Sequence, residues 1–93
     1  MNNKSINAQV IANFVETAGI EESCFGEIVE QAETIDGKHI KYFTFKIFSP
    51  DTEELFILAT MLGHLFGPKN IWIDTYKATQ KYLGYAKIEI SVK

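Results

Sequence analysis

The dipeptide Asp36-Gly37 is the feature that most restricts the fold of this chain. Both residue types tolerate the positive φ angles that a two-residue hairpin turn requires. The run that follows, residues 39–48, is rich in aromatic and β-branched side chains, as strands are. The run that precedes it, from about residue 25 to residue 35, carries several apolar residues and reads as a second strand. The sequence therefore predicts a β-hairpin centred on Asp36-Gly37.

A helix is predicted before this hairpin, near the N-terminus. Ser5 or Asn7 can cap it, and Gly19 offers the left-handed conformation that ends a helix. Between these positions apolar residues recur at a spacing of three to four, which lines one helix face. They are Ala8, Ile11, Val15 and Ala18, with Phe14 at the edge of the stripe.

A second helix is predicted over about residues 50–66. Ser49 suits the cap and Pro50 the first helical position, and the acidic residues that follow are favoured by the helix dipole. Gly67 can end the helix and Pro68 cannot continue it. One stripe of this helix is expected to enter the core: Leu55, Leu58, Ala59, Leu62, Leu65 and Phe66.

Two further strands are expected after the second helix, over residues 70–76 and 85–92, because both stretches alternate. Ninety-three residues are too few for two cores, so residues 1–93 form one domain. The order αββαββ predicts an α+β fold, with two helices on one face of a four-stranded, mainly antiparallel sheet. A ferredoxin-like arrangement with its first strand moved to the end is one topology that fits.

Aromatic residues make up 13% of the chain, a large supply for one small core. Strand alternation sends Tyr42, Trp72, Tyr76 and Tyr85 to the sheet face opposite the helices. Four exposed aromatic side chains would present roughly 600–1,000 Å², more than a monomer usually leaves in one patch. We therefore expect protein to cover this face, most simply a second copy of the chain.

The second helix carries apolar residues on another stripe as well. Ile57 and Met61 share it with His64, on the side opposite Leu55 and Leu62. Core packing uses only one side of an amphipathic helix. We expect this other side to be a second, smaller contact patch.

Charge is unevenly distributed along this acidic chain, whose net charge is −3. Residues 1–36 hold one lysine against seven acids, whereas the remainder is net positive. An acidic segment can steer a basic partner. The acids expected to do so are Glu21, Glu22, Glu27, Glu30 and Glu33. All nine cations are lysines, which disfavours nucleic acid because arginine is best suited to forked recognition of phosphates and bases.

The sequence lacks catalytic and metal-binding patterns. Cys24 lies among acids, which disfavour a thiolate, and His39 and His64 have no paired-ligand spacing. We expect no catalytic residue, no metal site and no cofactor. No apolar run reaches the roughly 18 residues of a membrane-spanning helix, and a lone cysteine agrees with a reducing compartment. We therefore expect a cytoplasmic protein.

These features predict a non-enzymatic protein-binding module. It would act as a homodimer, or as an inhibitor or adaptor that docks on a larger protein, and a phage-type host-interaction or antidefence protein would fit. One alternative is a dimeric α+β barrel with a small-molecule or enzymatic cavity, lined by the same four aromatic residues and His39. Another is a sheet that binds RNA or single-stranded DNA, with those residues as stacking platforms beside Lys41, Lys46 and Lys87.

Overall fold

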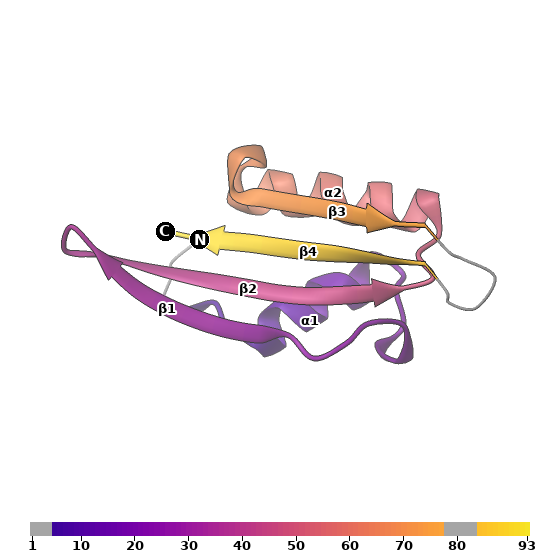
Figure 1. The fold of residues 1–93 in the computed structure, drawn as a ribbon, viewed down its shortest axis with the longest axis horizontal. Helices are drawn as coiled ribbons and strands as arrows, with labels where there is room; N and C mark the ends of the chain where they lie inside the picture. Colours follow the sequence, from indigo (N-terminus) through magenta and orange to yellow (C-terminus); the bar gives the residue numbers. More distant parts are fainter. Residues whose placement is uncertain (1–4, 78–83) are drawn as a thin grey trace.

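The computed structural model describes residues 5–77 and 84–93. The described residues form two α-helices, four strands and two short 3₁₀ helices (Figure 1). Their order and the antiparallel sheet confirm the predicted α+β class. The elements are α1 Ala8–Thr17, η2 Glu22–Cys24, β1 Val29–Ile35, β2 Lys38–Phe48, α2 Thr52–Phe66, η3 Pro68–Asn70, β3 Ile71–Tyr76 and β4 Tyr85–Val92.

The four strands form one sheet in the order β1-β2-β4-β3, and each neighbouring pair is antiparallel. The last strand of the chain therefore lies between β2 and β3 (Figure 1). The turn between β1 and β2 is the predicted one, because Asp36 and Gly37 have φ angles of 51° and 78°. Both angles lie in the left-handed region that a two-residue hairpin turn uses. The permuted ferredoxin-like arrangement stays a prediction.

Asn7, and not Ser5, caps α1. Its side chain accepts a hydrogen bond from the Val10 amide at 3.0 Å. Gly19 follows the helix with a φ of 97°, the left-handed stop that the sequence indicated. The helix directs its apolar stripe inward, with Ile11 fully buried.

The second helix begins at Thr52, later than predicted, and Asp51 is its cap. The Asp51 carboxylate accepts a hydrogen bond from the Glu53 amide at 2.8 Å. Ser49 was the wrong residue for the cap, because it has a φ of 47° and its amide donates to the Gly84 carbonyl at 2.8 Å. A cap needs an extended backbone, so the residue that turns the chain out of β2 cannot also start the helix.

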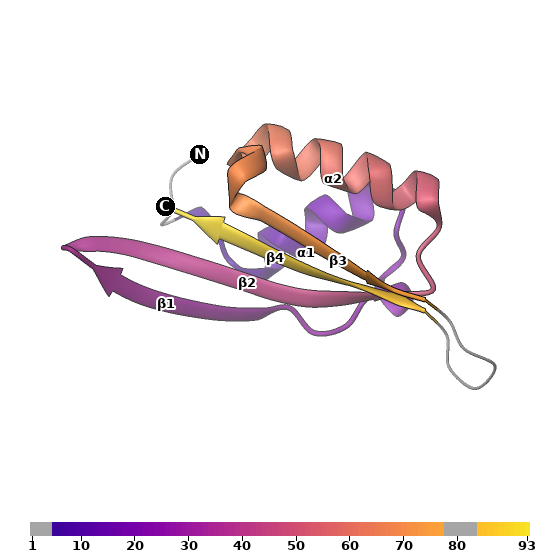
Figure 2. The same ribbon diagram turned by 45° about the horizontal axis from the view of Figure 1, so that its top comes forward.

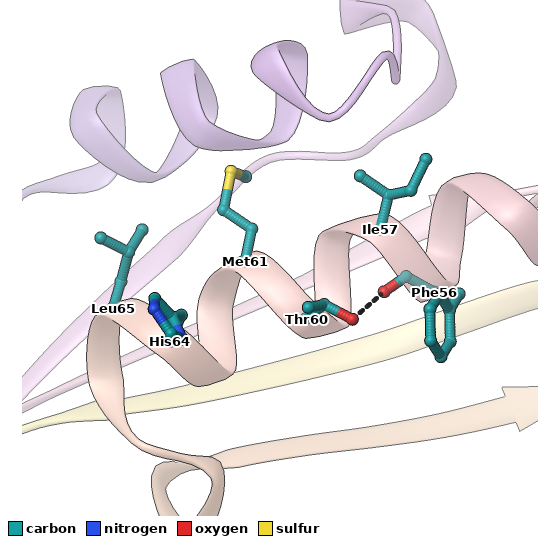
Figure 3. A pocket seen from close by; sticks show the side chains of 6 residues that line it. All are labelled: Phe56, Ile57, Thr60, Met61, His64 and Leu65. Atoms are coloured by element: carbon teal, nitrogen blue, oxygen red, sulfur yellow. Dashed lines mark hydrogen bonds between the residues drawn. The ribbon is translucent and has the colours of Figure 1, made fainter.

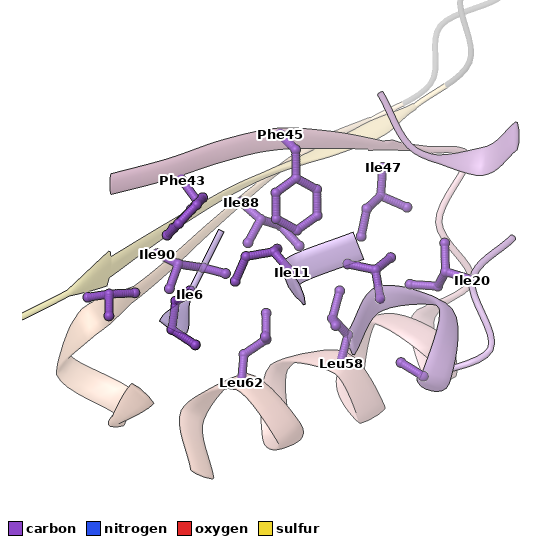
Figure 4. Packing of buried hydrophobic residues seen from close by; sticks show 13 residues of the cluster. Ile6, Ile11, Ile20, Phe43, Phe45, Ile47, Leu58, Leu62, Ile88 and Ile90 are labelled. Atoms are coloured by element: carbon purple, nitrogen blue, oxygen red, sulfur yellow. The ribbon is translucent and has the colours of Figure 1, made fainter. Parts of the chain in front are cut away.

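The core lies between the two helices and one face of the sheet (Figure 4). On the α2 side, Leu58 and Leu62 are fully buried, and Leu55 and Phe66 pack against the core while partly buried. The prediction for Leu65 was wrong. This residue lies outside the core cluster and lines the outer side of the helix, because Phe66, the next residue, takes the position that packs against the core.

β1 is shorter than predicted, and no helix covers it. Residues 25–28 lie outside the strand, and Phe25 makes only an isolated bridge to Ile47. All seven residues of β1 are exposed. Figure 2 shows the β1–β2 hairpin extending past the two helices. β1 is therefore an edge strand that the helices leave uncovered.

Candidate protein-interaction surfaces

The open sheet face is the side of the sheet away from the helices, and the register places Tyr42, Trp72, Tyr76 and Tyr85 on it. Phe48 joins them, because Phe48, Tyr85 and Tyr76 lie opposite one another across three strands. The rings of Tyr76 and Tyr85 stack, with their centroids 4.5 Å apart and their planes at 17°. One end of the open sheet face is thus an aromatic row.

A row of charged residues crosses the open sheet face beside this aromatic row. Lys46, Lys87 and Asp74 lie opposite one another in the register. The Lys46 Nζ atom is 4.9 Å from the centre of the Tyr85 ring, and Lys87 pairs with Glu89 at 3.5 Å. Burying such groups costs free energy unless the partner supplies matching charges. The open sheet face is therefore suited to a partner of complementary charge rather than to a purely apolar one.

The aromatic residues of the open sheet face are less exposed than the sequence suggested. Trp72 and Tyr76 are 48% and 46% exposed, and Tyr42 and Tyr85 are less exposed still. Neighbouring side chains already cover more than half of these rings, so the four present roughly 200–400 Å². A patch of this size is ordinary for a monomer. Area alone therefore does not require a second copy on this face.

A shallow hollow of about 320 Å³ lies on the open sheet face and spans all four strands. It is lined by Gln31, Glu33, Tyr42, Thr44, Trp72 and Glu89. The hollow forms where short side chains lie between longer ones. Ser91 is buried opposite Tyr42, and Thr44 lies opposite Glu89. Carboxylates beside aromatic rings suit the cationic end of a lysine or arginine side chain.

The acidic segment does not gather on one surface. Glu33 and Glu27 border hollows of the open sheet face, whereas Glu30 lies on the helix side of the sheet, paired with Phe43. Glu21 and Glu22 are exposed at η2, near the start of the 3₁₀ turn. What the segment shares is a lack of bases, because residues 5–37 contain no lysine, arginine or histidine. The β1 edge is therefore acidic.

The outer face of α2 is a second surface, defined by Phe56, Ile57, Thr60, Met61, His64 and Leu65 (Figure 3). These residues line a shallow hollow of about 480 Å³. They include no carboxylate and no lysine. Ile57 is 46% exposed, whereas Met61 is half-buried and also packs against the core. That this side of α2 makes a contact stays a prediction.

Sequence reasoning missed Phe56, which is 72% exposed and the most exposed large apolar side chain among the described residues. Its place on the outer side of the helix could have been predicted from the sequence. Phe56 lies one turn before Thr60 and outside the stripe of Leu58 and Leu62. The Thr60 hydroxyl donates to the Phe56 carbonyl at 2.9 Å, within the helix (Figure 3).

The residues proposed for the two alternative functions are divided between the faces. His39 lies on the helix side of the sheet, opposite Thr34, whose hydroxyl is 3.2 Å from His39 Nδ1. Lys41 is on that side as well and donates to the Ile6 carbonyl at 2.9 Å. Neither residue therefore shares a face with Tyr42 and Trp72. Cys24 is exposed, and no group of metal-ligating side chains able to hold an ion occurs in residues 5–77 and 84–93.

Comparisons of the chain with protein families, curated proteins and solved structures give no match. Within the described part of the chain, no helix has the length and apolar character needed to cross a membrane. The surfaces themselves are therefore the guide to function.

Proposed function

We propose that the protein is a non-enzymatic protein-binding module that takes up an extended, basic segment of a larger protein along β1. The segment adds to the sheet as a fifth strand, which is a recurring mode of peptide recognition. One observation carries the proposal: β1 is exposed at all seven positions and borders the hollow between Tyr42 and Trp72. The protein would thus act as an inhibitor or adaptor.

The β1 edge offers backbone groups to another strand. β1 is the terminal strand of the sheet and pairs only with β2. Natural proteins protect such edges with charged side chains, proline or a bulge. β1 has no proline or lysine, and its pairing with β2 runs without a break. Glu30 and Glu33 are its only charged residues, so they oppose an acidic strand and favour a basic one.

The hollow supplies selectivity for a basic side chain. Neighbouring strands are about 4.8 Å apart, so a long side chain from a fifth strand crosses over β1 and reaches Tyr42 on β2. A lysine or arginine in this position meets the Glu33 carboxylate and the face of an aromatic ring. Hydrogen bonds between charged groups are stronger than neutral ones, and cation–π contacts add to them.

Nucleic acid and a small-molecule cavity have less support. Tyr76 and Tyr85 stack on each other, which occupies faces that bases would use. Lysines of the open sheet face are accompanied by Asp74, Glu33 and Glu89, so the face has no basic character. A cytoplasmic location remains part of the proposal and has the support of the single, free Cys24.

The test is an NMR titration with a capped peptide of alternating lysine and valine, about nine residues long, to match the edge of β1. We expect saturable shift changes in β1 and around Tyr42, and no binding of the matching glutamate–valine peptide. Glu33→Lys should weaken binding about tenfold or more, because it removes a charge-assisted contact and adds repulsion.

The matched control is Glu16→Lys, which makes the same charge change on the exposed side of α1. It should leave peptide binding within about twofold, since surface charges farther than a Debye length are screened. If both variants weaken peptide binding equally, binding depends only on the net charge of the protein, which contradicts a site on β1. Tight binding of a polyuridine oligonucleotide at physiological salt would favour the RNA alternative instead.

A further inference from the structure

Charge changes from acidic to basic along the outer face of α2, from the first turn of the helix to its end. Glu53 lies in the first turn, on the same stripe as Ile57, Thr60 and His64. His64 lies in the last turn, and Lys69 follows in η3. Acids at the start and bases at the end of a helix are favoured by its dipole. The helix dipole does not explain the apolar residues between them.

The two exposed large apolar residues of this face, Phe56 and Ile57, are not needed by the core of the monomer, whereas Met61 packs against it. Leu58 and Leu62 already supply the fully buried contacts of α2. Phe56 is 72% exposed and Ile57 46% exposed, and Figures 1 and 2 show no element of the fold outside α2. Apolar surface with charge only at its ends is typical of an interface that has an apolar centre and a polar rim.

We infer that a second copy of this chain covers the outer face of α2, with the two helices antiparallel. A two-fold axis near Thr60 and Met61 sets Ile57 of one copy opposite His64 of the other and brings the two exposed Thr60 side chains close together. Glu53 of one copy then lies at the level of Lys69 of the other, and this pair occurs twice.

The charge pattern is the reason to choose a second copy. A face that is acidic at one end, apolar in the middle and basic at the other end becomes its own complement when it is reversed. With the helices parallel, acid would face acid. The solvent-exposed area of the six side chains is on the order of 400–500 Å² on each copy. Burying this area would give an interface at the low end of the size range of specific complexes. We therefore expect a reversible dimer with a Kd on the order of 10–100 μM.

Sedimentation velocity from about 5 to about 500 μM spans this range and measures the dimer directly. The wild type should change from monomer to dimer with concentration, and Phe56→Glu should stay monomeric. Phe56 is so exposed that this substitution leaves the core intact, which circular dichroism will check. Trp72→Glu is the matched control on the open sheet face and should dimerise like the wild type.

A charge swap tests the orientation of the two helices. Glu53→Lys and Lys69→Glu should each weaken the dimer about three- to tenfold, since each removes two rim contacts. The double variant should return to within about threefold of the wild type because the pairs form again with reversed sign. A wild type that is monomeric at the highest concentration overturns the inference. So does a dimer that Trp72→Glu dissociates and Phe56→Glu does not, or a double variant that is not restored.

This inference is independent of peptide binding along β1. Phe56→Glu should bind the lysine–valine peptide with unchanged affinity, and loss of peptide binding in Glu33→Lys should leave the dimer unchanged. Failure of one proposal is thus distinguishable from failure of the other.

Discussion

The open sheet face and the outer face of α2 both expose large apolar side chains, and they differ in charge. Lys46, Lys87 and Asp74 cross the open sheet face, whereas the residues that line the outer face of α2 include no carboxylate and no lysine. A buried charge must find a partner, and a buried methyl group need not. The first surface is therefore selective for a complementary partner, and the second can pack on any matching apolar surface.

The difference comes from the elements that carry the two surfaces. Alternate residues of a strand are forced to the second face of the sheet, so this face mixes whatever the alternate positions hold. A helix leaves most of its circumference free of core contacts, where polar residues cost nothing. Exposed apolar residues such as Phe56 and Ile57 are thus less expected on a helix than an exposed aromatic residue such as Tyr42 is on a strand. They are therefore stronger evidence for a contact.

The largest expected effect separates the two sides of α2. Leu62→Ala should lower the free energy of unfolding by about 2–5 kcal/mol, because Leu62 is fully buried in the core. Phe56→Ala should change it by less than about 0.5 kcal/mol at concentrations where the protein is monomeric. Chemical denaturation at low concentration measures both. A Leu62→Ala cost below about 0.5 kcal/mol would show that the core stripe is wrong.

The next effect separates the two surfaces. Trp72→Lys should weaken binding of the lysine–valine peptide about tenfold or more without unfolding the domain, because Trp72 is half exposed and lines the hollow, and the substitution replaces an aromatic ring by a charge of the same sign as the peptide's. Calorimetric titration measures the affinity. If Trp72→Glu converts a dimer to a monomer, the second copy lies on the open sheet face, as the sequence predicted. If either variant unfolds the chain, Trp72 belongs to the core and the two sheet faces are reversed.

Salt should affect the two surfaces unequally. Raising sodium chloride from about 50 to about 500 mM should weaken the peptide complex several-fold, because exposed charges are screened. The α2 dimer should weaken less, by no more than about threefold, since salt screens its rim ion pairs but does not weaken the hydrophobic contact at its centre. Titrations and sedimentation at both salt concentrations test this. An equal loss would mean that charge governs both surfaces.

The smallest effect concerns the residues that could carry catalysis. The triple variant Cys24→Ser, His39→Gln, His64→Gln should keep peptide binding within about twofold, because none of the three lines the hollow beside β1. The measurement is the same NMR titration. A folded triple variant that has lost a biological activity would contradict the non-enzymatic interpretation.

Local rules predicted the parts of the fold in which a residue's conformation depends on its neighbours in sequence. Asp36 and Gly37 form the expected turn, and Gly19 has the expected left-handed conformation. The same rules failed at Ser49, whose conformation is set by leaving β2 next to Gly84. For Leu65 the apolar pattern was ambiguous, and packing decided that Phe66 beside it contacts the core while Leu65 lines the outer side of α2.

Some features of the candidate surfaces could likewise be predicted from the sequence, and others could not. Alternation was enough to place Tyr42 and Trp72 on the face away from the helices, because successive strand residues point to opposite sides whatever the strand order. Periodicity likewise separated Ile57 from Leu62. The strand order decided what alternation could not. It places Glu33, Tyr42 and Trp72 around one hollow, leaves β1 as an edge, and puts His39 and Lys41 on the helix side. These relations join residues far apart in the chain, and only tertiary packing brings such residues together.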